Sequence, residues 1–247
     1  MLVALVNQER LTEAEHKARA LLRTCPDAGI LWKILGIALL RQGKDALATL
    51  RRTAELMPHD AEAHGNLGAA LHDQGQWTAS LVCLQRSLAI DPRNVEALVD
   101  AADAMRALGR VDQAIAWYQR ALQLDPRRVE AQNNLGNAFL QLRRFHEAAG
   151  CYRLALEIRP DYAQVHCNLG EALRQLGLME EAIASSLRAL ALDPTLGAAF
   201  INLGLSLAAQ GRLEQAAASY RRALSLDVGD GQAMNSLRTV LRELGAS

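Results

Sequence analysis

The chain of 247 residues is 50% hydrophobic and balances 27 Lys and Arg against 27 Asp and Glu. This neutrality argues against a non-specific nucleic-acid binder, which needs a basic excess. No apolar run approaches the roughly 18 residues that cross a bilayer, and the first residues lack the cleavage pattern of a secretory signal. We therefore expect a cytoplasmic protein without membrane insertion and without a nucleic-acid partner.

Six prolines divide the chain at nearly constant intervals. They are Pro26, Pro58, Pro92, Pro126, Pro160 and Pro194, and the steps between them are 32 residues once and then 34 residues four times. Proline is tolerated at the start of a helix but not inside it, so each proline marks a boundary. A pattern with this period predicts similar helical units that stack, because one such unit cannot bury its apolar face alone.

The N-terminal part of the chain departs from the regular period. Residues 1–28 resemble the end of a unit and predict a partial unit with a short first helix. Residues 29–60 form a full unit that is two residues shorter than the others. The missing residues fall between Gly43 and Ala46, so we expect a shorter turn between two helices that stay in phase.

The rest of the chain predicts five regular units and a capping helix. The units are 61–94, 95–128, 129–162, 163–196 and 197–230, and residues 231–247 repeat the first-helix pattern once more. Four units carry glycine in the turn between their helices (Gly75, Gly109, Gly177 and Gly211), and glycine tolerates the left-handed conformation that ends a helix. Arg143 takes this place in unit 129–162. We expect the units to form one continuous domain.

Bulky and small residues recur at fixed places in every unit. In unit 29–60 the pattern is Trp32-x2-Leu35-Gly36-x2-Leu39, followed by Ala46 and Leu50. This pattern resembles the tetratricopeptide repeat. The resemblance implies an all-α fold, a right-handed superhelical solenoid of antiparallel helix pairs. It also implies that the first helices line a concave groove and that the second helices face outward.

The sequence contains no motif for catalysis or for a metal. It has no His-Glu-x-x-His, no phosphate-binding loop and no Gly-x-Ser-x-Gly. His64 and His72 are eight residues apart, whereas two ligands on one helix face need a spacing of three or four. Cys25, Cys83, Cys151 and Cys167 form no Cys-x-x-Cys pair. We predict no enzymatic activity, no catalytic residue, no cofactor, no metal and reduced cysteines.

The sixth position of each unit is the first candidate for binding. The resemblance places this position in the groove, where the units carry Asn66, Asp100, Asn134, Asn168 and Asn202. An asparagine amide can donate to and accept from a peptide backbone. The series resembles the asparagine ladder in the repeat region of O-linked N-acetylglucosamine transferases. The alternative is that each amide bonds a neighbouring helix. Asn133, Asn137 and Arg174 complete the polar groove candidates.

Acidic residues are the second groove feature. Glu62, Glu96 and Glu130 share the second position of successive units, and Asp100 and Asp103 lie on one helix face. They predict attraction of a basic peptide segment, with charge helping the encounter more than the final affinity. The alternative is that the three glutamates only complement the helix dipole in the first turn of each helix. That alternative is weaker for Asp100 and Asp103.

Trp117 is the candidate contact on the outer face. It occupies a place where other units carry Cys83, Cys151, Ser185 or Ser219. An aromatic residue there can contact a partner or a second copy, or it can pack into the seam between units.

Three functions are consistent with these residues. The first is a non-catalytic scaffold for protein–protein interaction that binds extended, basic peptide segments in its concave groove. The second is the substrate-recruiting repeat region of a glycosyltransferase of the O-linked N-acetylglucosamine type. The third is a scaffold that assembles with itself as a homo-oligomer.

Overall fold

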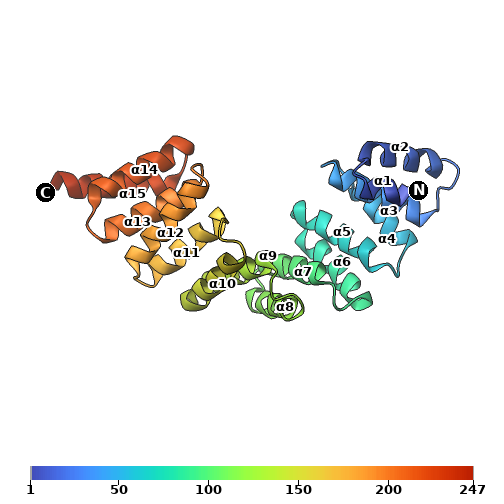
Figure 1. The fold of residues 1–247 in the computed structure, drawn as a ribbon, viewed down its shortest axis with the longest axis horizontal. Coiled ribbons are helices and arrows are strands. Elements are labelled where there is room, and N and C mark those ends of the chain that lie inside the picture. Colours follow the sequence, from blue (N-terminus) through green and yellow to red (C-terminus); the bar gives the residue numbers. More distant parts are fainter. Residues whose placement is uncertain (1, 247) are drawn as a thin grey trace. The chain divides into compact units, whose positions relative to one another are not determined.

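The computed structural model describes residues 2–246 of the chain, with side chains up to residue 245. Within this range the chain forms fifteen α-helices and no strand, which confirms the predicted all-α fold. The residues group into two compact halves, Met1–Asp125 and Pro126–Ser247, where the sequence suggested one continuous domain. Each half is a series of helices in which consecutive helices pack side by side (Figure 1).

The N-terminal half contains helices α1 to α8, coloured blue to green in Figure 1. Their bounds are α1 Leu2–Asn7, α2 Leu11–Leu22, α3 Gly29–Arg41, α4 Leu47–Leu56, α5 Ala61–Asp73, α6 Trp77–Ile90, α7 Val95–Ala107 and α8 Val111–Leu124. First helices of successive units also contact one another, as α1 contacts α3 and α5 contacts α7. They therefore form a layer of their own within this half.

The C-terminal half contains helices α9 to α15, whose colours run to red at the C-terminal end in Figure 1. Their bounds are α9 Val129–Gln141, α10 Phe145–Ile158, α11 Ala163–Gln175, α12 Met179–Leu192, α13 Gly197–Ala209, α14 Leu213–Leu226 and α15 Gly231–Ala246. The first helices α9, α11, α13 and α15 again contact one another in order.

A glycine under a large side chain brings the two helices of a unit together. A Cβ atom placed on Gly136 would lie 2.5 Å from Tyr152, and one placed on Gly68 would lie 2.5 Å from Leu84. Tyr152 and Leu84 are fully buried. The small residue of the first helix and the large residue of the second are therefore complementary, which gives the dense packing of a protein interior.

The turns between the helices confirm the left-handed conformation expected from glycine. Gly75 and Gly177 have φ angles of 71° and 79°. Arg143 adopts the same conformation with φ 59°, although it carries a side chain. The turn geometry is thus kept in unit 129–162 at the cost of backbone strain in a non-glycine residue.

Unit 29–60 accommodates its two missing residues in the helix and not in the turn, so that prediction was wrong. Helix α4 has 10 residues, whereas α6 has 14. The connection before α4 covers residues 42–46, whereas the one before α6 covers only residues 74–76. A helix advances only about 1.5 Å per residue, against about 3.3 Å for extended chain. Because the first turn of α4 is unwound into extended chain, the shortened segment still spans the distance between α3 and α4.

Side chains at the fourth position of several units fasten the loop that precedes them. The Trp32 Nε1 atom donates to the Pro26 carbonyl over 2.7 Å. The Nε2 atoms of His64 and His166 make the same contact with Pro58 and Pro160 at 3.1 and 2.9 Å. A donor at this place thus holds the proline loop against the first helix, which gives these two histidines a structural role.

Candidate functional site

An acidic hollow lies between α5 and α7 in the N-terminal half. Its volume is about 120 Å³, and it is lined by Glu62, Gly65, Asn66, Ala69, Asn94, Glu96, Ala97 and Asp100. Four of the groove residues expected from the sequence (Glu62, Asn66, Glu96 and Asp100) therefore meet in one place. Two adjacent first helices supply them because they share positions two and six of their units.

Lys33 of α3 partly neutralises this hollow. Its Nζ atom lies 2.8 Å from Asp60 Oδ2 and 2.6 Å from Glu62 Oε2. Burial alone would lower the pKa of Lys33, but the hydrogen bonds to Asp60 and Glu62 raise it above its usual value. Glu96 is exposed, and within residues 2–246 it forms no ion pair. The hollow keeps a net negative charge, with Glu96 as its most accessible acid.

An aliphatic hollow adjoins the acidic one. Its volume is about 260 Å³, and it is lined by Val3, Val6, Asn7, Ile30, Lys33, Ile34, Ile37, Arg41 and Glu62. Ile30 is 53% exposed at its edge. Glu62 belongs to both hollows, so an apolar pocket and an acidic pocket lie next to each other along α1, α3, α5 and α7. We call the two together the N-terminal groove.

Asp103 has a structural partner, which the sequence did not indicate. Its carboxylate accepts a hydrogen bond from the hydroxyl of Tyr118, which is fully buried in α8. Burial, and then the negative charge of Asp103, raise the pKa of Tyr118 well above its usual range. Asp103 therefore satisfies a buried hydroxyl and is not an exposed acid of the hollow.

The asparagines of α9 and α11 form one hydrogen-bonded network in the C-terminal half. The Asn168 Nδ2 atom donates to Asn133 Oδ1 at 3.0 Å and to Asn137 Oδ1 at 3.1 Å. Asn133 in turn donates to Asn134 over 3.0 Å, and the Tyr152 hydroxyl donates to Asn137 over 2.8 Å. Among the sixth-position asparagines here, Asn168 thus bonds a neighbouring helix, whereas the bond from Asn133 to Asn134 lies within α9.

Asn202 lies deeper than a groove residue. It is 8% exposed, and its Nδ2 atom donates to the Cys167 carbonyl over 3.3 Å. Its amide therefore joins α13 to α11, which differs from the exposed position expected for a ladder. Burial raises the pKa of the neighbouring Cys167 thiol to about 11, which keeps it protonated and unreactive.

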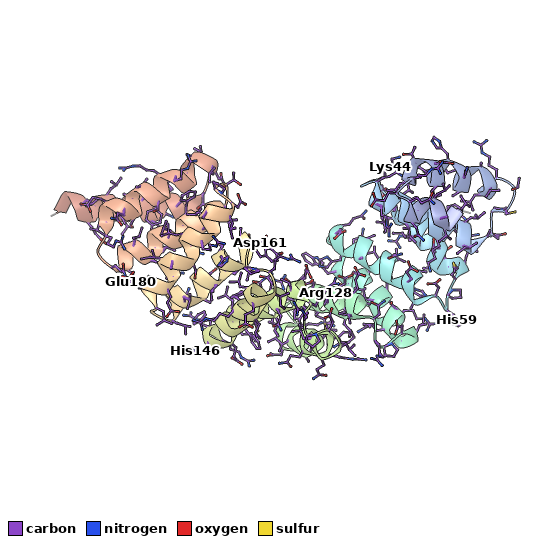
Figure 2. All side chains as sticks on the ribbon, in the orientation of Figure 1. Lys44, His59, Arg128, His146, Asp161 and Glu180 are labelled. Atoms are coloured by element: carbon purple, nitrogen blue, oxygen red, sulfur yellow. The ribbon has the colours of Figure 1, made fainter. Side chains whose placement is uncertain are left out.

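The remaining polar candidates also have local neighbours. Glu130 lies 2.9 Å from Arg159 Nη2 and 3.4 Å from the Nε atom of Arg128, which is labelled in Figure 2. A hydrogen bond from its own backbone amide and the two arginines lower the pKa of Glu130. Glu130 is therefore held by the fold before any ligand arrives. Arg174 is half-buried. Burial raises the pKa of Tyr220, and the positive charge of Arg174 opposes that rise.

Trp117, the candidate outer contact, is half-buried in α8. The outer surface holds instead a hollow that the sequence interpretation missed. Its volume is about 410 Å³, and it is lined by Arg51, Ala54, Glu55, His64, Leu67, Val82, Cys83 and Arg86. We call it the outer hollow. The residue in the sequence that could have indicated the outer hollow is Val82. The later units carry a smaller residue at its place, namely Ala116, Gly150, Ala184 and Ala218.

Neither metal chemistry nor a membrane span has support in the described part of the chain. Residues 2–246 contain no group of three or more His, Cys, Asp or Glu side chains that could hold a metal ion. The four cysteines are free thiols. None of the described helices is long and apolar enough to cross a membrane.

Family models match most of the chain. A model described as TPR repeat matches residues 102–143, and two described as tetratricopeptide repeat match residues 3–48 and 133–196, and residues 61–94 and 197–230. The chain carries tetratricopeptide repeats. This family assignment confirms the resemblance drawn from the sequence pattern, and it agrees with the helix pairs described above.

Solved structures of repeat proteins are similar to the chain. A chain in the structure of the APC/C hetero-tetramer Cut9–Hcn1 matches 97% of this chain with a TM-score of 0.80 and 16% identity, and the match spans 48% of that chain's own length. YrrB, described as a TPR protein with an unusual peptide-binding site, matches 76% of the chain at 18% identity and TM-score 0.63, over 97% of its own length. A thermophilic TPR protein of Thermus thermophilus matches 73% at 26% identity and TM-score 0.59, over 98% of its length.

These matches establish the fold and leave the partner open. Identities of 16% and 18% show a common fold alone. No protein with a curated description matches the chain. The resemblance to the repeat region of O-linked N-acetylglucosamine transferases finds no support among these relatives.

Proposed function

We propose that this tetratricopeptide repeat chain is a non-catalytic scaffold that binds an extended peptide segment of a partner protein in the N-terminal groove. The observation that carries the proposal is the adjoining pair of hollows, one aliphatic and one acidic, on consecutive first helices. A concave surface of first helices is the usual binding side of such solenoids. The peptide-binding site named for YrrB, a protein with this fold, is consistent with such a role.

The chemistry of the groove selects an aliphatic and basic segment. Ile30, Ile34 and Ile37 offer contact to an aliphatic side chain. Glu96 and Asn66 lie in the next hollow, where a lysine or arginine of the same segment gains a counter-charge and an amide acceptor. Charged groups of this kind increase the rate of association and set the register of the bound segment.

A labelled synthetic peptide with alternating leucine and lysine tests the proposal. We expect the double variant Glu62→Gln, Glu96→Gln to bind it about three- to tenfold more weakly at low salt. The difference should shrink as the ionic strength rises, because salt screens exposed charges. Fluorescence anisotropy measures the affinity. A Ser–Lys peptide of equal charge should bind more weakly than the Leu–Lys peptide if the aliphatic hollow takes part.

Glu214→Gln in α14 is the matched control, since it removes an exposed carboxylate from the other half of the chain. Equal binding by the wild-type chain and the double variant at low salt would refute the acidic hollow as the site. Light scattering on the same samples tests the alternative of a homo-oligomer, because a self-assembling scaffold would scatter as more than one chain without any peptide.

A further inference from the structure

The outer hollow has an apolar floor that water reaches. Ala54 of α4, Leu67 of α5 and Val82 and Cys83 of α6 contribute it. Val82 is 63% exposed. Single exposed apolar residues are common on protein surfaces, but here the exposed valine opens into a concave space of about 410 Å³. A hollow with such a floor can bury an apolar side chain of another molecule.

Two arginines of the rim are not paired with an acid within the part of the chain that the structure describes. Arg51 of α4 and Arg86 of α6 line the hollow and are not buried. Among residues 2–246 neither forms an ion pair. The nearby Glu55 is engaged by Arg52, whose Nη1 atom lies 3.2 Å from Glu55 Oε2. The rim therefore attracts negative charge.

The outer hollow is separate from the N-terminal groove. Both surfaces use α5, but Glu62 and Asn66 line the groove, whereas His64 and Leu67 line the outer hollow. A helix turns by about 100° per residue, so these two pairs lie on different faces of α5. A ligand of opposite charge on one face leaves the other face accessible.

We propose that the outer hollow docks an acidic, aliphatic peptide segment of a partner protein. A leucine or similar side chain of the segment packs on Leu67 and Val82, and its flanking carboxylates pair with Arg51 and Arg86. Guanidinium groups bind carboxylates through paired hydrogen bonds, which suits a rim of arginines. The scaffold then holds a second partner of opposite charge to the one in the N-terminal groove.

Cys83 reports occupancy of the hollow directly. It is half-buried in the hollow, whereas Cys25 is exposed elsewhere in the chain. The probe is a synthetic peptide with alternating leucine and glutamate, and the readout is alkylation of each cysteine by N-ethylmaleimide, followed by mass spectrometry. At saturating peptide we expect Cys83 to be alkylated at least about fivefold more slowly, since bound peptide covers the thiol. Cys25 should react at an unchanged rate and serves as the internal control.

Matched variants separate this site from the groove. Arg51→Glu with Arg86→Glu should weaken binding of the Leu–Glu peptide about tenfold, and Val82→Ser should weaken it less. The groove variant Glu62→Gln, Glu96→Gln should leave protection of Cys83 intact. Circular dichroism checks that each variant is folded, which we expect because none of the substituted side chains is buried.

Three outcomes would overturn the proposal. One is unchanged alkylation of Cys83 at peptide concentrations that saturate binding. Another is equal protection by a Ser–Glu peptide, which would mean attraction of charge without apolar docking. The third is equal protection by the Leu–Lys peptide, which would remove the role of the arginines. The first two results would leave peptide binding in the N-terminal groove untouched, whereas the third would show that the Leu–Lys probe of the groove also occupies the outer hollow.

Discussion

Arg143 stands where the other regular units carry a turn glycine, yet it keeps the left-handed backbone conformation of that turn. Its φ angle of 59° lies in the region where a Cβ atom costs about 1–2 kcal/mol. Glycine avoids this cost but loses more chain entropy on folding. Arg143 also stacks over Phe145 at 5.8 Å, which the variant would lose. We expect Arg143→Gly to raise the free energy of unfolding by about 0.5–1 kcal/mol, measured by urea denaturation.

Gly177→Ala is the matched control for that prediction. Gly177 has a φ angle of 79° at the equivalent turn, with open space around it. Any loss of stability there comes from the backbone and not from a clash, so Gly177→Ala should destabilise the chain. A stabilising Gly177→Ala, or a destabilising Arg143→Gly, would contradict the assignment of strain to the left-handed turn.

Glu15 is the residue that makes stability depend on acidic pH. Its carboxylate accepts hydrogen bonds from Lys44 at 2.8 Å, Arg19 at 3.0 Å and Gln42 at 3.2 Å. The bond from Lys44 above all, against the opposing effect of burial, lowers the pKa of Glu15 to about 2. Lys44, labelled in Figure 2, thereby ties the turn after α3 to α2.

The sign of this pH effect follows from the lowered pKa. The contribution of Glu15 to stability is complete above its unfolded pKa of about 4.5 and is lost as the pH falls from there toward 2. We expect Glu15→Gln to cost about 1–2 kcal/mol at pH 7, and less at pH 3. Denaturation at both pH values measures the difference. The exposed Glu157 in α10 supplies the control Glu157→Gln, which should show little change at either pH.

Residue type and position in the unit predicted the surroundings of the sixth-position asparagines only in part. Asn66 lines the acidic hollow, whereas Asn202 is 8% exposed and bonds the Cys167 carbonyl. The same residue at the same position serves two purposes because its surroundings differ. Those surroundings depend on side chains of the preceding unit, such as Asn133 and Asn137 beside Asn168, and on how closely the helices approach.

At the scale of elements, the amide network fastens α9 to α11. Asn168 donates from α11 to two oxygens on α9 and accepts from Gln164 over 2.9 Å. We expect Asn168→Ala to cost about 1–3 kcal/mol, since half-buried acceptors lose their donor. Hydrogen exchange measured by mass spectrometry should show faster exchange in α9 and α11. Asn66→Ala, which lines an open hollow, should stay within about 0.5 kcal/mol of wild type. Equal effects of the two substitutions would argue against a special role for the network.

Helices and turns were more predictable than the adjustment of α4. Period, prolines and turn glycines indicate the helix pairs, because each reflects a local backbone constraint. The deletion near Gly43 was assigned to the turn, yet α4 gives up its first turn and keeps 10 residues. The choice depends on the distance that the chain must cross between two packed helices, which the local sequence does not contain.

At the scale of the whole molecule, contacts between helices that are close in sequence predict that a destabilising substitution has a local effect. Within each half, the helix contacts of the described residues join helices that lie one or two places apart in chain order. Stability of such an array is close to a sum of unit and neighbour contributions. A substitution in one unit should therefore weaken its neighbours and leave distant units of the chain intact, in contrast to the all-or-none unfolding of a small globular domain.

Leu50 in α4 is suited to test this behaviour. It is 1% exposed and packs on Gly36 of α3, where an added Cβ would lie 2.8 Å from Leu50 Cδ2. Leu50→Ala removes buried methyl groups and leaves a cavity, at a cost of about 2–5 kcal/mol. Hydrogen exchange should become faster in α2 to α5, while α11 to α14 keep wild-type protection. Uniform loss of protection along all these helices would mean that the chain unfolds as one cooperative body, and local stacking would then be the wrong description of its stability.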